Sequence, residues 1–273
     1  VVSARELSLE EIRGIRSRIP EELEIETFIH GAMCISYSGG VCSATTSPDG
    51  MPTREPVPIP AGGNIPLWRR QGPNEYMPVY ENERGTYIFN SKDLCMIEHM
   101  EDVLTCGIDS LKIEGRMKTA LYVATVARTY RKAIDDYFSD PSLYREHMPW
   151  YREQISNCTY RQFTTGFFYG KPDSDTQIYD QNTYLKEYTY LGYVEAKDDR
   201  GLCRITQRNK FSVGETIEVM KPDGRNISVQ VKSILDEEGS PRESAPHPKE
   251  VLYLDLGIEL DPYDILRRQE ESA

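Results

Sequence analysis

The sequence predicts an α/β region followed by an all-β region within 273 residues, a length that suffices for one large domain or two modest ones. In the first half, strand-like segments alternate with helical segments, which is the pattern of βα units and of a parallel sheet or barrel. From Tyr184 onward the chain contains only short strand-like segments separated by turns. That pattern is typical of a small antiparallel barrel or sandwich.

The first half is predicted to contain strands at 23–30, 86–90 and 110–115 and helices at 91–106 and 117–138. The opening residues, Val1 to Arg5, are typical of the end of a buried strand that runs into a helix stopped by Pro20. Three or four βα units cannot close an eightfold barrel. We therefore expect the chain to be an N-terminally truncated fragment of a longer barrel.

The second half is predicted to form strands at 187–196, 202–208, 216–220, 227–234 and 251–256, with turns rich in Asp, Gly and Pro between them. The boundaries expected are a partial barrel at 1–140, a connecting segment at 141–182 and an all-β domain at 183–268. The core of the last domain is predicted to consist of Leu191, Val194, Ile205, Phe211, Ile217, Val219, Val229, Val231 and Leu254.

Composition excludes several classes of protein. The chain carries 44 acidic against 32 basic residues, a net charge of −12, which argues against a general polyanion binder but leaves room for a local basic cleft. No run approaches the roughly 18 apolar residues of a membrane span, and no signal peptide precedes the first charged residues. The six cysteines form no tight framework, so a reducing cytoplasm is the expected compartment.

The first candidate site follows the third predicted strand. Glu114, Arg116 and Lys118 surround Gly115 where a strand ends, and in barrels of βα units the active groups lie on the loops after the strands. An arginine there can hold a carboxylate or phosphate through two parallel hydrogen bonds. The alternative is an ordinary charged loop with an ion pair at the start of a helix.

The second candidate site is the segment from His30 to Cys34, which leads into a loop rich in Gly and Ser. A cysteine near a histidine is compatible with thiol nucleophilic catalysis or with metal ligation, and a buried cysteine beside a hydrogen-bonded histidine is the structural alternative. The sequence contains no glycine-rich phosphate loop, no Gly-x-Ser-x-Gly elbow and no His-Glu-x-x-His pair.

Three segments, ETFIHGAMCISYSG, GTYIFNSKDLCMIEHM and GIDSLKIEGRMKTALYVATVARTYRKAIDDY, closely resemble the collagenase-like proteases of peptidase family U32. The segments YRQFTTGFFYGKP, QRNKFSVGETIEVMKPDG and SAPHPKEVLYLDLG are similar to the C-terminal domain of that family. The resemblance implies a TIM-like barrel that is followed by a C-terminal β-barrel. It covers nearly the whole chain.

The resemblance is strongest to the bacterial proteins for prephenate-dependent hydroxylation of a tRNA wobble uridine, and it implies that function. It also implies a [4Fe-4S] iron–sulfur cluster on four cysteines, of which Cys34 would be one, with His30 in support. Glu114, Arg116, Lys118 and His30 are then the candidate catalytic residues, and transfer RNA is the expected partner. Arg204, Arg208, Lys210, Lys221 and Arg225 are expected to contact RNA from the C-terminal domain.

The chain departs from the family pattern after Cys34. Where the family has further cysteines, residues 41–72 are rich in Pro and Gly, and we interpret them as a frame-shifted stretch of the coding sequence. Read in a shifted frame, the codons of Gly40 to Ile65 can encode a segment with a Cys-x-x-x-Cys pair. Cys42 is on this hypothesis an accidental neighbour of the cluster site, and the chain as written would not bind the cluster.

Two other functions remain open from the sequence. One is a peptidase that hydrolyses peptide or collagen-like substrates, although the chain shows no catalytic dyad and no zinc signature. The other is an inactive fragment that lacks part of a barrel and most cluster cysteines. The sequence also leaves open whether a partner subunit completes the fold.

Overall fold

The structure is a computed structural model that describes residues 1–33, 92–158, 162–170, 188–198 and 201–270, together with the backbone of several short strands between these ranges. The chain divides into two compact units that alternate along the sequence. Unit 1 consists of Val1–Glu114 and Arg161–Thr183, and unit 2 consists of Gly115–Tyr160 and Tyr184–Ala273.

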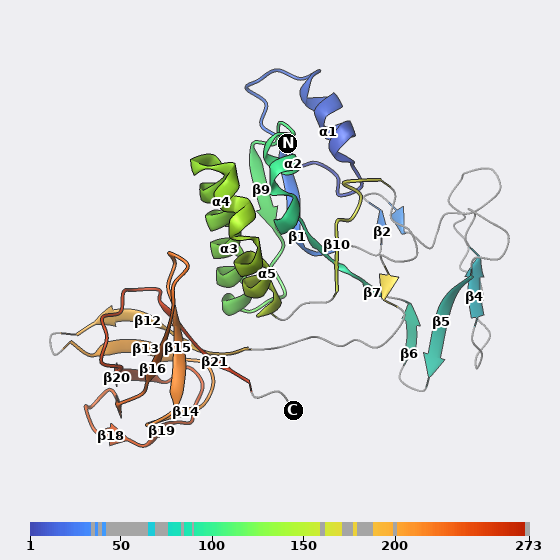
Figure 1. Ribbon diagram of the computed structural model, residues 1–273. Coiled ribbons are helices and arrows are strands. Elements are labelled where there is room, and N and C mark those ends of the chain that lie inside the picture. The colour runs from blue at the N-terminus through green and yellow to red at the C-terminus, as the bar shows by residue number, and fades with distance from the viewer. Residues whose placement is uncertain are drawn as a thin grey trace. The chain divides into compact units, whose positions relative to one another are not determined.

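Unit 1 is built on a four-stranded sheet in the order β10-β8-β1-β9. β1 (Glu26–Ala32) pairs in parallel with β9 (Ser110–Ile113) and antiparallel with β8 (Asp93–Cys95), and β10 (Phe163–Thr164) pairs in parallel with β8. Figure 1 shows β1 and β9 side by side. The parallel pair agrees with the predicted βα pattern, but the sheet as a whole is mixed.

Seven further short strands of unit 1 are described by their backbone alone. They are β2 (Ser36–Tyr37), β3 (Gly40–Val41), β4 (Ile65–Trp68), β5 (Tyr76–Asn82), β6 (Gly85–Ile88), β7 (Asn90–Ser91) and β11 (Gln177–Ile178). The strand predicted at 86–90 falls on β6 and the first residue of β7. Residues 42–64, the larger part of the segment interpreted as frame-shifted, lie outside the described residues.

The helices of unit 1 are short. α1 (Leu9–Arg16) begins at Ser8, whose side chain accepts a hydrogen bond from the Glu11 backbone while the Glu11 carboxylate bonds back to Ser8. This is a capping box, which satisfies two backbone donors at the helix start. The chain then forms a 3-10 turn, η1 (Ile97–His99), and the helix α2 (Met100–Leu104).

The single helix predicted at 91–106 is wrong for its first part. Residues Asp93–Cys95 form β8 instead, since Cys95 lies opposite His30 and Asp93 opposite Ala32 in the antiparallel pair with β1. Leu94, Ile97, Met100 and Leu104 have helical spacing in the sequence, but Leu94 belongs to the strand. A distant strand thus overrides the local helical pattern.

Unit 2 begins with three helices. α3 (Ala120–Ser139) is capped by Thr119, whose hydroxyl accepts a hydrogen bond from the Tyr122 backbone at 3.2 Å. α4 (Pro141–Glu146) follows after Asp140, whose carboxylate accepts from the Ser142 backbone, and α5 (Met148–Ser156) follows α4. Asp140 and the proline after it end one helix and start the next, as expected for an N-cap followed by proline at the first helical position.

The strands of unit 2 form one curled antiparallel sheet in the order β16-β15-β21-β12-β13-β20-β17-β18. β14 and β19 form a separate pair. The strands are β12 (Tyr188–Lys197), β13 (Cys203–Gln207), β14 (Phe211–Ser212), β15 (Thr216–Met220), β16 (Asn226–Gln230), β17 (Ser233–Leu235), β18 (Pro241–Arg242), β19 (Ser244–Ala245), β20 (Val251–Asp255) and β21 (Ile265–Gln269). β21 was not predicted from the sequence, and the strand predicted at 227–234 divides into β16 and β17.

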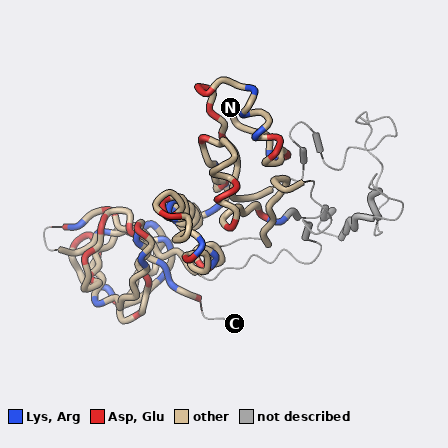
Figure 2. The backbone as a smooth tube through the Cα atoms, turned by 45° about the horizontal axis from the view of Figure 1, so that its top comes forward, with Lys and Arg blue, Asp and Glu red and all other residues tan. Residues whose placement is uncertain are grey.

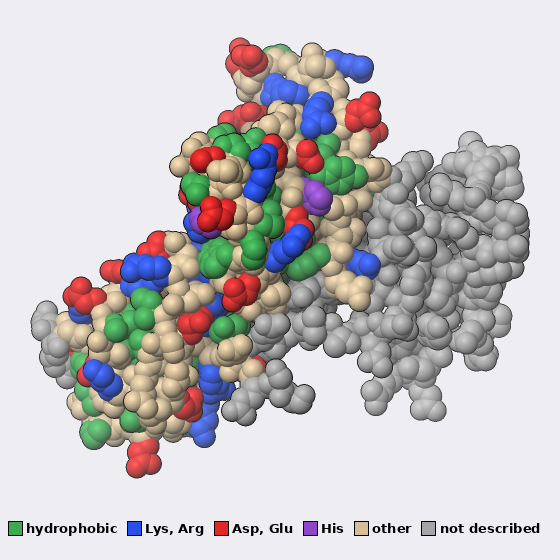
Figure 3. Space-filling model, viewed as in Figure 1, with side chains coloured by type: hydrophobic (Ala, Val, Ile, Leu, Met, Phe, Trp, Pro, Cys, Tyr) green, Lys and Arg blue, Asp and Glu red, His purple; other side chains and the backbone are tan. Residues whose placement is uncertain are grey.

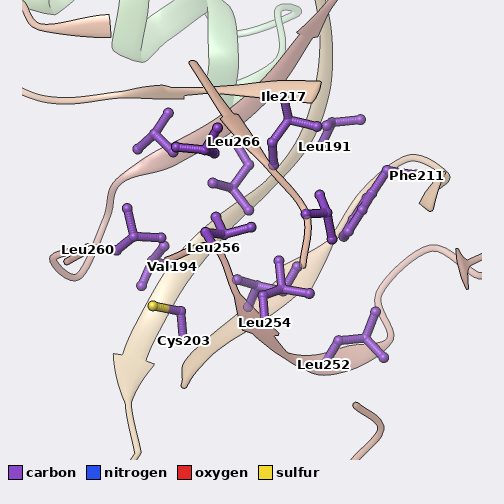
Figure 4. Close-up of a cluster of buried hydrophobic side chains, with 14 of the residues drawn as sticks. Leu191, Val194, Cys203, Phe211, Ile217, Leu252, Leu254, Leu256, Leu260 and Leu266 are labelled. Atoms are coloured by element: carbon purple, nitrogen blue, oxygen red, sulfur yellow. The ribbon is translucent and has the colours of Figure 1, made fainter. Parts of the chain in front are cut away.

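The core of this sheet lies on its inner face (Figure 4), where apolar side chains from different strands point toward one another. All nine residues predicted for this core belong to the buried cluster, and Leu191, Ile205, Phe211 and Leu254 are fully buried. Alternation along β13, with Cys203 and Ile205 inside, places every second side chain on that face. The predicted antiparallel all-β region is thus confirmed.

The helices of unit 2 also pack against its strands. Leu121 of α3 is buried with Met220 and Ile265, and Tyr188, Tyr190 and Tyr193 of β12 cover this cluster. The second contact is polar. The buried guanidinium of Arg128 donates to the Lys221 carbonyl at 3.0 Å, to Asn226 Oδ1 at 2.9 Å and to Gln154 Oε1, and burial lowers its pKa to about 10.

Within the described residues, unit 1 shows a mixed four-stranded sheet rather than a closed barrel, so the TIM-like barrel remains a prediction. α3 is the longest helix described. No helix among the described residues combines the length and apolar character that a membrane span requires.

Candidate active site at the carboxyl ends of β1 and β9

The parallel pair β1–β9 brings two predicted site residues together. His30 lies opposite Ile113, with an irregularity in the register between Phe28 and His30. The backbone N–H of Glu114, the residue after β9, donates to the His30 carbonyl at 2.8 Å. Because both strands end at the same edge of the sheet, His30 and Glu114 become neighbours although they lie far apart in the sequence.

Gly31 makes this close approach possible. Its φ is +119°, and a Cβ at this position would lie 2.5 Å from the Glu114 carbonyl oxygen and 2.6 Å from the Glu114 Cβ. Any side chain would therefore collide with the backbone of Glu114, and an L-residue would also be strained at this φ. The glycine thus fixes Glu114 against the end of β1.

Arg5 holds the same edge, and sequence reasoning did not identify it as a site residue. Its Nη1 donates to the Ala32 carbonyl at 2.6 Å, and its Nη2 lies 3.3 Å from Glu114 Oε2. The guanidinium also stacks 4.0 Å from the centre of the Phe28 ring. A lone arginine just before the first predicted helix was the available signal, but its partners at 32 and 114 depend on the tertiary structure.

A second ion pair lies along the same two strands. Lys112 Nζ is 2.7 Å from Glu26 Oε1, and the Ser110 hydroxyl donates to the other carboxylate oxygen at 3.1 Å. The hydrogen bonds from Lys112 and then Ser110 lower the pKa of Glu26. Lys112 Nζ is also 5.2 Å from the Phe28 ring centre, so this aromatic side chain contacts both Arg5 and Lys112.

His30 is buried, with 1% of its surface exposed, and its ring lies 5.7 Å from the ring of Phe163. Asp93, opposite Ala32 in β8, is equally buried. The Glu114 side chain, by contrast, is one-third exposed. Of the residues predicted here, Glu114 is accessible to a ligand, whereas His30 belongs to the interior that supports it.

The other two predicted catalytic residues lie in unit 2. Arg116 is exposed. Lys118 is half-buried, donates from its backbone to the Gly115 carbonyl at 3.0 Å and places its Nζ 5.0 Å from the Tyr122 ring centre. Their roles remain predictions.

Cys34 and Cys42 lie outside the described residues. The four described cysteines form no disulfide with one another, and Cys106, Cys158 and Cys203 are buried. Burial raises the pKa of all three thiols, to about 12 for Cys158. Among the described residues, no three His, Cys, Asp or Glu side chains are grouped to hold a metal. The described cysteines therefore do not fit an iron–sulfur cluster, whose ligands are thiolates.

A mixed sheet with charged groups at the ends of its parallel strands is followed by a curled antiparallel sheet, which defines an α/β region with a separate all-β region. Comparison with known families agrees with this class. The model of peptidase family U32 matches residues 1–178, and that of the peptidase family U32 C-terminal domain matches residues 186–267. The chain belongs to peptidase family U32.

Similar proteins carry two kinds of name. The chain is 34% identical over 269 residues to tRNA hydroxylation protein P1 of Bacillus subtilis, covering 98% of this chain and 63% of that protein. It is 32% identical to tRNA hydroxylation protein P of Escherichia coli, covering 98% of this chain and 67% of that protein. A collagenase of Porphyromonas gingivalis is 28% identical over 261 residues, covering 86% of this chain and 58% of the collagenase.

The chain thus spans less than two thirds of the length of its B. subtilis relative. Among solved structures, the C-terminal domain of a U32 peptidase from Geobacillus thermoleovorans matches 30% of this chain and 92% of its own length, with 29% identity and a TM-score of 0.28.

Proposed function

We propose that this chain is part of an RNA-modifying enzyme that hydroxylates the wobble uridine of transfer RNA, with prephenate as the hydroxyl donor. One observation carries the proposal: the B. subtilis and E. coli relatives at 34% and 32% identity, which match 98% of this chain, are named for tRNA hydroxylation. Because the chain spans 63% of the B. subtilis protein, the activity of the whole enzyme is part of the proposal. The cytoplasm is the compartment that goes with it.

Within this proposal, Glu114 is the group at the strand ends that is accessible to substrate. Its carboxylate lies 3.3 Å from Arg5 and is positioned through Gly31, so it can hold or move a proton at a fixed place. His30 acts as a positioning residue, since its side chain is buried and its backbone carbonyl accepts the Glu114 N–H at 2.8 Å. Arg116 and Lys118 keep their predicted role as cations suited to the carboxylates of prephenate. Because they belong to unit 2, no geometry relative to Glu114 is assigned to them.

Cys34 is proposed as an iron–sulfur ligand on the family resemblance. The described cysteines give no support to a cluster, so no chemical step is assigned to it. Iron content of the purified chain, compared between the wild type and Cys34→Ala, tests this ligand.

The function is tested in an E. coli strain that lacks its own tRNA hydroxylation proteins. The strain produces a chimera in which this chain replaces the matching part of the E. coli relative, and the rest of that relative is kept. Mass spectrometry of nucleosides from total tRNA then measures the amount of hydroxylated uridine. We expect the chimera to restore it and Glu114→Gln to reduce it by about 100-fold, the usual contribution of an acid–base group. Glu10→Gln, on the exposed face of α1, is the matched control.

A chimera that is produced and folded but yields no hydroxylated uridine would contradict the proposed function. Full activity of Glu114→Gln would contradict the role of Glu114 alone, while the function would stand.

The similarity to the P. gingivalis collagenase supports a second candidate, a peptidase acting on collagen-like substrates. A thiol peptidase requires a reactive thiolate, and the three buried cysteines have raised pKa values. Hydrolysis of gelatin by the purified chain, abolished by Cys34→Ala, would favour the peptidase. A chain that shows neither activity, alone or in the chimera, would be an inactive fragment.

A further inference from the structure

The cations of the unit 2 sheet divide into two groups by their partners. Arg204 Nη1 lies 3.5 Å from Glu195, and Arg225 Nη2 lies 2.7 Å from Asp223. Lys221, which we expected to contact RNA, is buried, and its Nζ lies 2.9 Å from Asp261 and 2.5 Å from Asp264. The expectation is therefore wrong for Lys221, because two carboxylates already compensate its charge in the interior.

A second group has no such compensation within the part of the chain that the structure describes; it includes Lys232, whose N–H donates to the carbonyl of Asp255 at the far end of β20 from Lys249, and three cations at the other end. Among the described residues, no carboxylate lies within ion-pair distance of Arg208, Lys210 or Lys249. Lys210 and Lys249 are exposed, and Arg208 is half-buried. We call these three residues the β13–β14 patch.

The backbone brings the three residues to one place. Arg208 and Lys210 lie in the turn between β13 and β14. Lys249 precedes β20, the partner of β13, and its N–H donates to the carbonyl of Gln207 at 2.8 Å. Residues 39 and 41 positions apart in the sequence thus lie close together where the β13–β20 pair ends.

Two neighbours border the patch. Arg268 Nη1 donates to the Lys210 carbonyl at 3.2 Å, and Glu215 compensates its charge at 3.0 Å. Half-buried Tyr190 accepts a hydrogen bond at its carbonyl from the Asn209 side chain at 2.7 Å. Burial raises the pKa of the Tyr190 hydroxyl, while the charge of Arg208 and its side-chain hydrogen bond to Tyr190 oppose that rise.

The surroundings make this patch distinctive. Figure 2 shows Lys and Arg interspersed with Asp and Glu along the backbone of unit 2, and the face visible in Figure 3 likewise mixes both signs. With a net charge of −12 for the chain, long-range attraction of a polyanion is weak. Binding of such a partner must therefore depend on the few cations that are exposed and lack an acidic partner.

We propose that the β13–β14 patch binds the phosphate backbone of the substrate RNA and docks it on unit 2. This inference rests on the proposed function, since it takes tRNA as the partner. Lysine and arginine contacts to phosphates position a nucleic acid without reading its sequence. The patch fits that role because it carries three positive charges and lies beside the aromatic side chain of Tyr190.

The test compares two triple variants that remove the same charge. The patch variant is Arg208→Gln, Lys210→Gln and Lys249→Gln. The control variant is Arg204→Gln, Arg225→Gln and Arg242→Gln, three partly exposed arginines that each have an acidic partner. Binding of unmodified tRNA is measured by fluorescence anisotropy between about 50 and 200 mM salt, and thermal melting checks that both variants fold.

We expect the patch variant to bind tRNA at least tenfold more weakly and to lower the slope of log Kd against log salt by about 2–3, one phosphate contact for each lost cation. The control variant should change affinity less than about threefold. An equal loss of tRNA affinity in both variants, or an unchanged affinity in the patch variant, would overturn the proposed role of the patch. The proposed function would then still stand. A wild-type chain that binds no tRNA would overturn the proposed role of the patch, and the hydroxylation assay of the chimera then decides whether the proposed function stands without docking here.

Discussion

The core of unit 2 and the edge of the unit 1 sheet are stabilised by different kinds of contact. The strands of unit 2 share one apolar cluster, whose members alternate along β13 and β20, whereas the edge of the unit 1 sheet that carries Glu114 depends on a few specific pairs. Arg5 and Glu114 meet across 109 positions of the chain, and Gly31 contacts Glu114 through the backbone. A local pattern is therefore sufficient to predict the first kind of structure, and insufficient for the second.

The largest expected effect on stability comes from a substitution in the apolar core of unit 2. Phe211 is fully buried in the cluster, so Phe211→Ala should lower the free energy of unfolding by about 3–5 kcal/mol through lost burial and a residual cavity. Val213, two residues away and 41% exposed, provides the control, and Val213→Ala should cost less than about 0.5 kcal/mol. Urea unfolding followed by circular dichroism measures both, and similar costs would mean that Phe211 does not belong to a packed core.

The next prediction concerns a substitution at the edge of the unit 1 sheet, where β1 ends. Gly31→Ala should lower the free energy of unfolding by about 2–3 kcal/mol, because the new methyl group would clash with the Glu114 backbone and the residue would keep a positive φ. The same substitution at Gly14 of α1, where nothing lies within 4 Å of the added carbon, should stabilise by about 0.5–1 kcal/mol. Opposite signs in thermal melting would support the close approach of the two strands. Two neutral substitutions would contradict it.

The smallest effect concerns a polar cluster among the helices of unit 2. Asp136 on α3 accepts hydrogen bonds from Lys132 Nζ at 2.9 Å, from His147 Nδ1 at 2.8 Å and from the Tyr151 hydroxyl. Burial by itself would raise the pKa of Asp136, but the hydrogen bonds from Tyr151, His147 and Lys132 outweigh it, and the pKa lies below the usual 3.8.

A lowered pKa means that the carboxylate stabilises the folded state above the unfolded pKa of about 3.9 and ceases to do so as pH falls through the folded value. Asp136→Asn should therefore cost about 1–2 kcal/mol at pH 7, and the cost should shrink below pH 4. Asp135→Asn, on an exposed pair with Arg131, should cost less than about 0.5 kcal/mol. Urea unfolding at pH 7 and pH 3 tests this, and a cost for Asp136→Asn that does not depend on pH would contradict it.

Much of the fold was predictable where the relevant contacts are close in the sequence. Strands β12, β13, β15 and β20 lie within one residue of their predicted bounds, and the nine predicted core residues are buried. The helix predicted over 91–106 fails because β8 is selected by its partner β1 rather than by its own pattern. β21 was missed because it does not alternate between apolar and polar residues: Ile265, Leu266 and Arg267 are all buried, and Glu218 compensates the charge of Arg267.

The candidate site shows the same division. Glu114 was found because a charged residue follows a strand. Arg5 was missed because its partners lie at the ends of two distant strands. His30 was found as a polar residue on a strand, but the sequence did not reveal that its side chain is buried.

The sequence by itself determined that this chain has a region of alternating strands and helices, a curled antiparallel region with a known core, and motifs of peptidase family U32. It could do so because hydrophobic periodicity and turn residues act within a few positions of the chain. Only the tertiary structure decided that Gly31 admits Glu114 to the end of β1, that Lys221 is compensated in the interior, and that Arg208, Lys210 and Lys249 meet on one surface. Those arrangements arise from strand pairing and charge compensation between distant residues, which a local pattern does not encode.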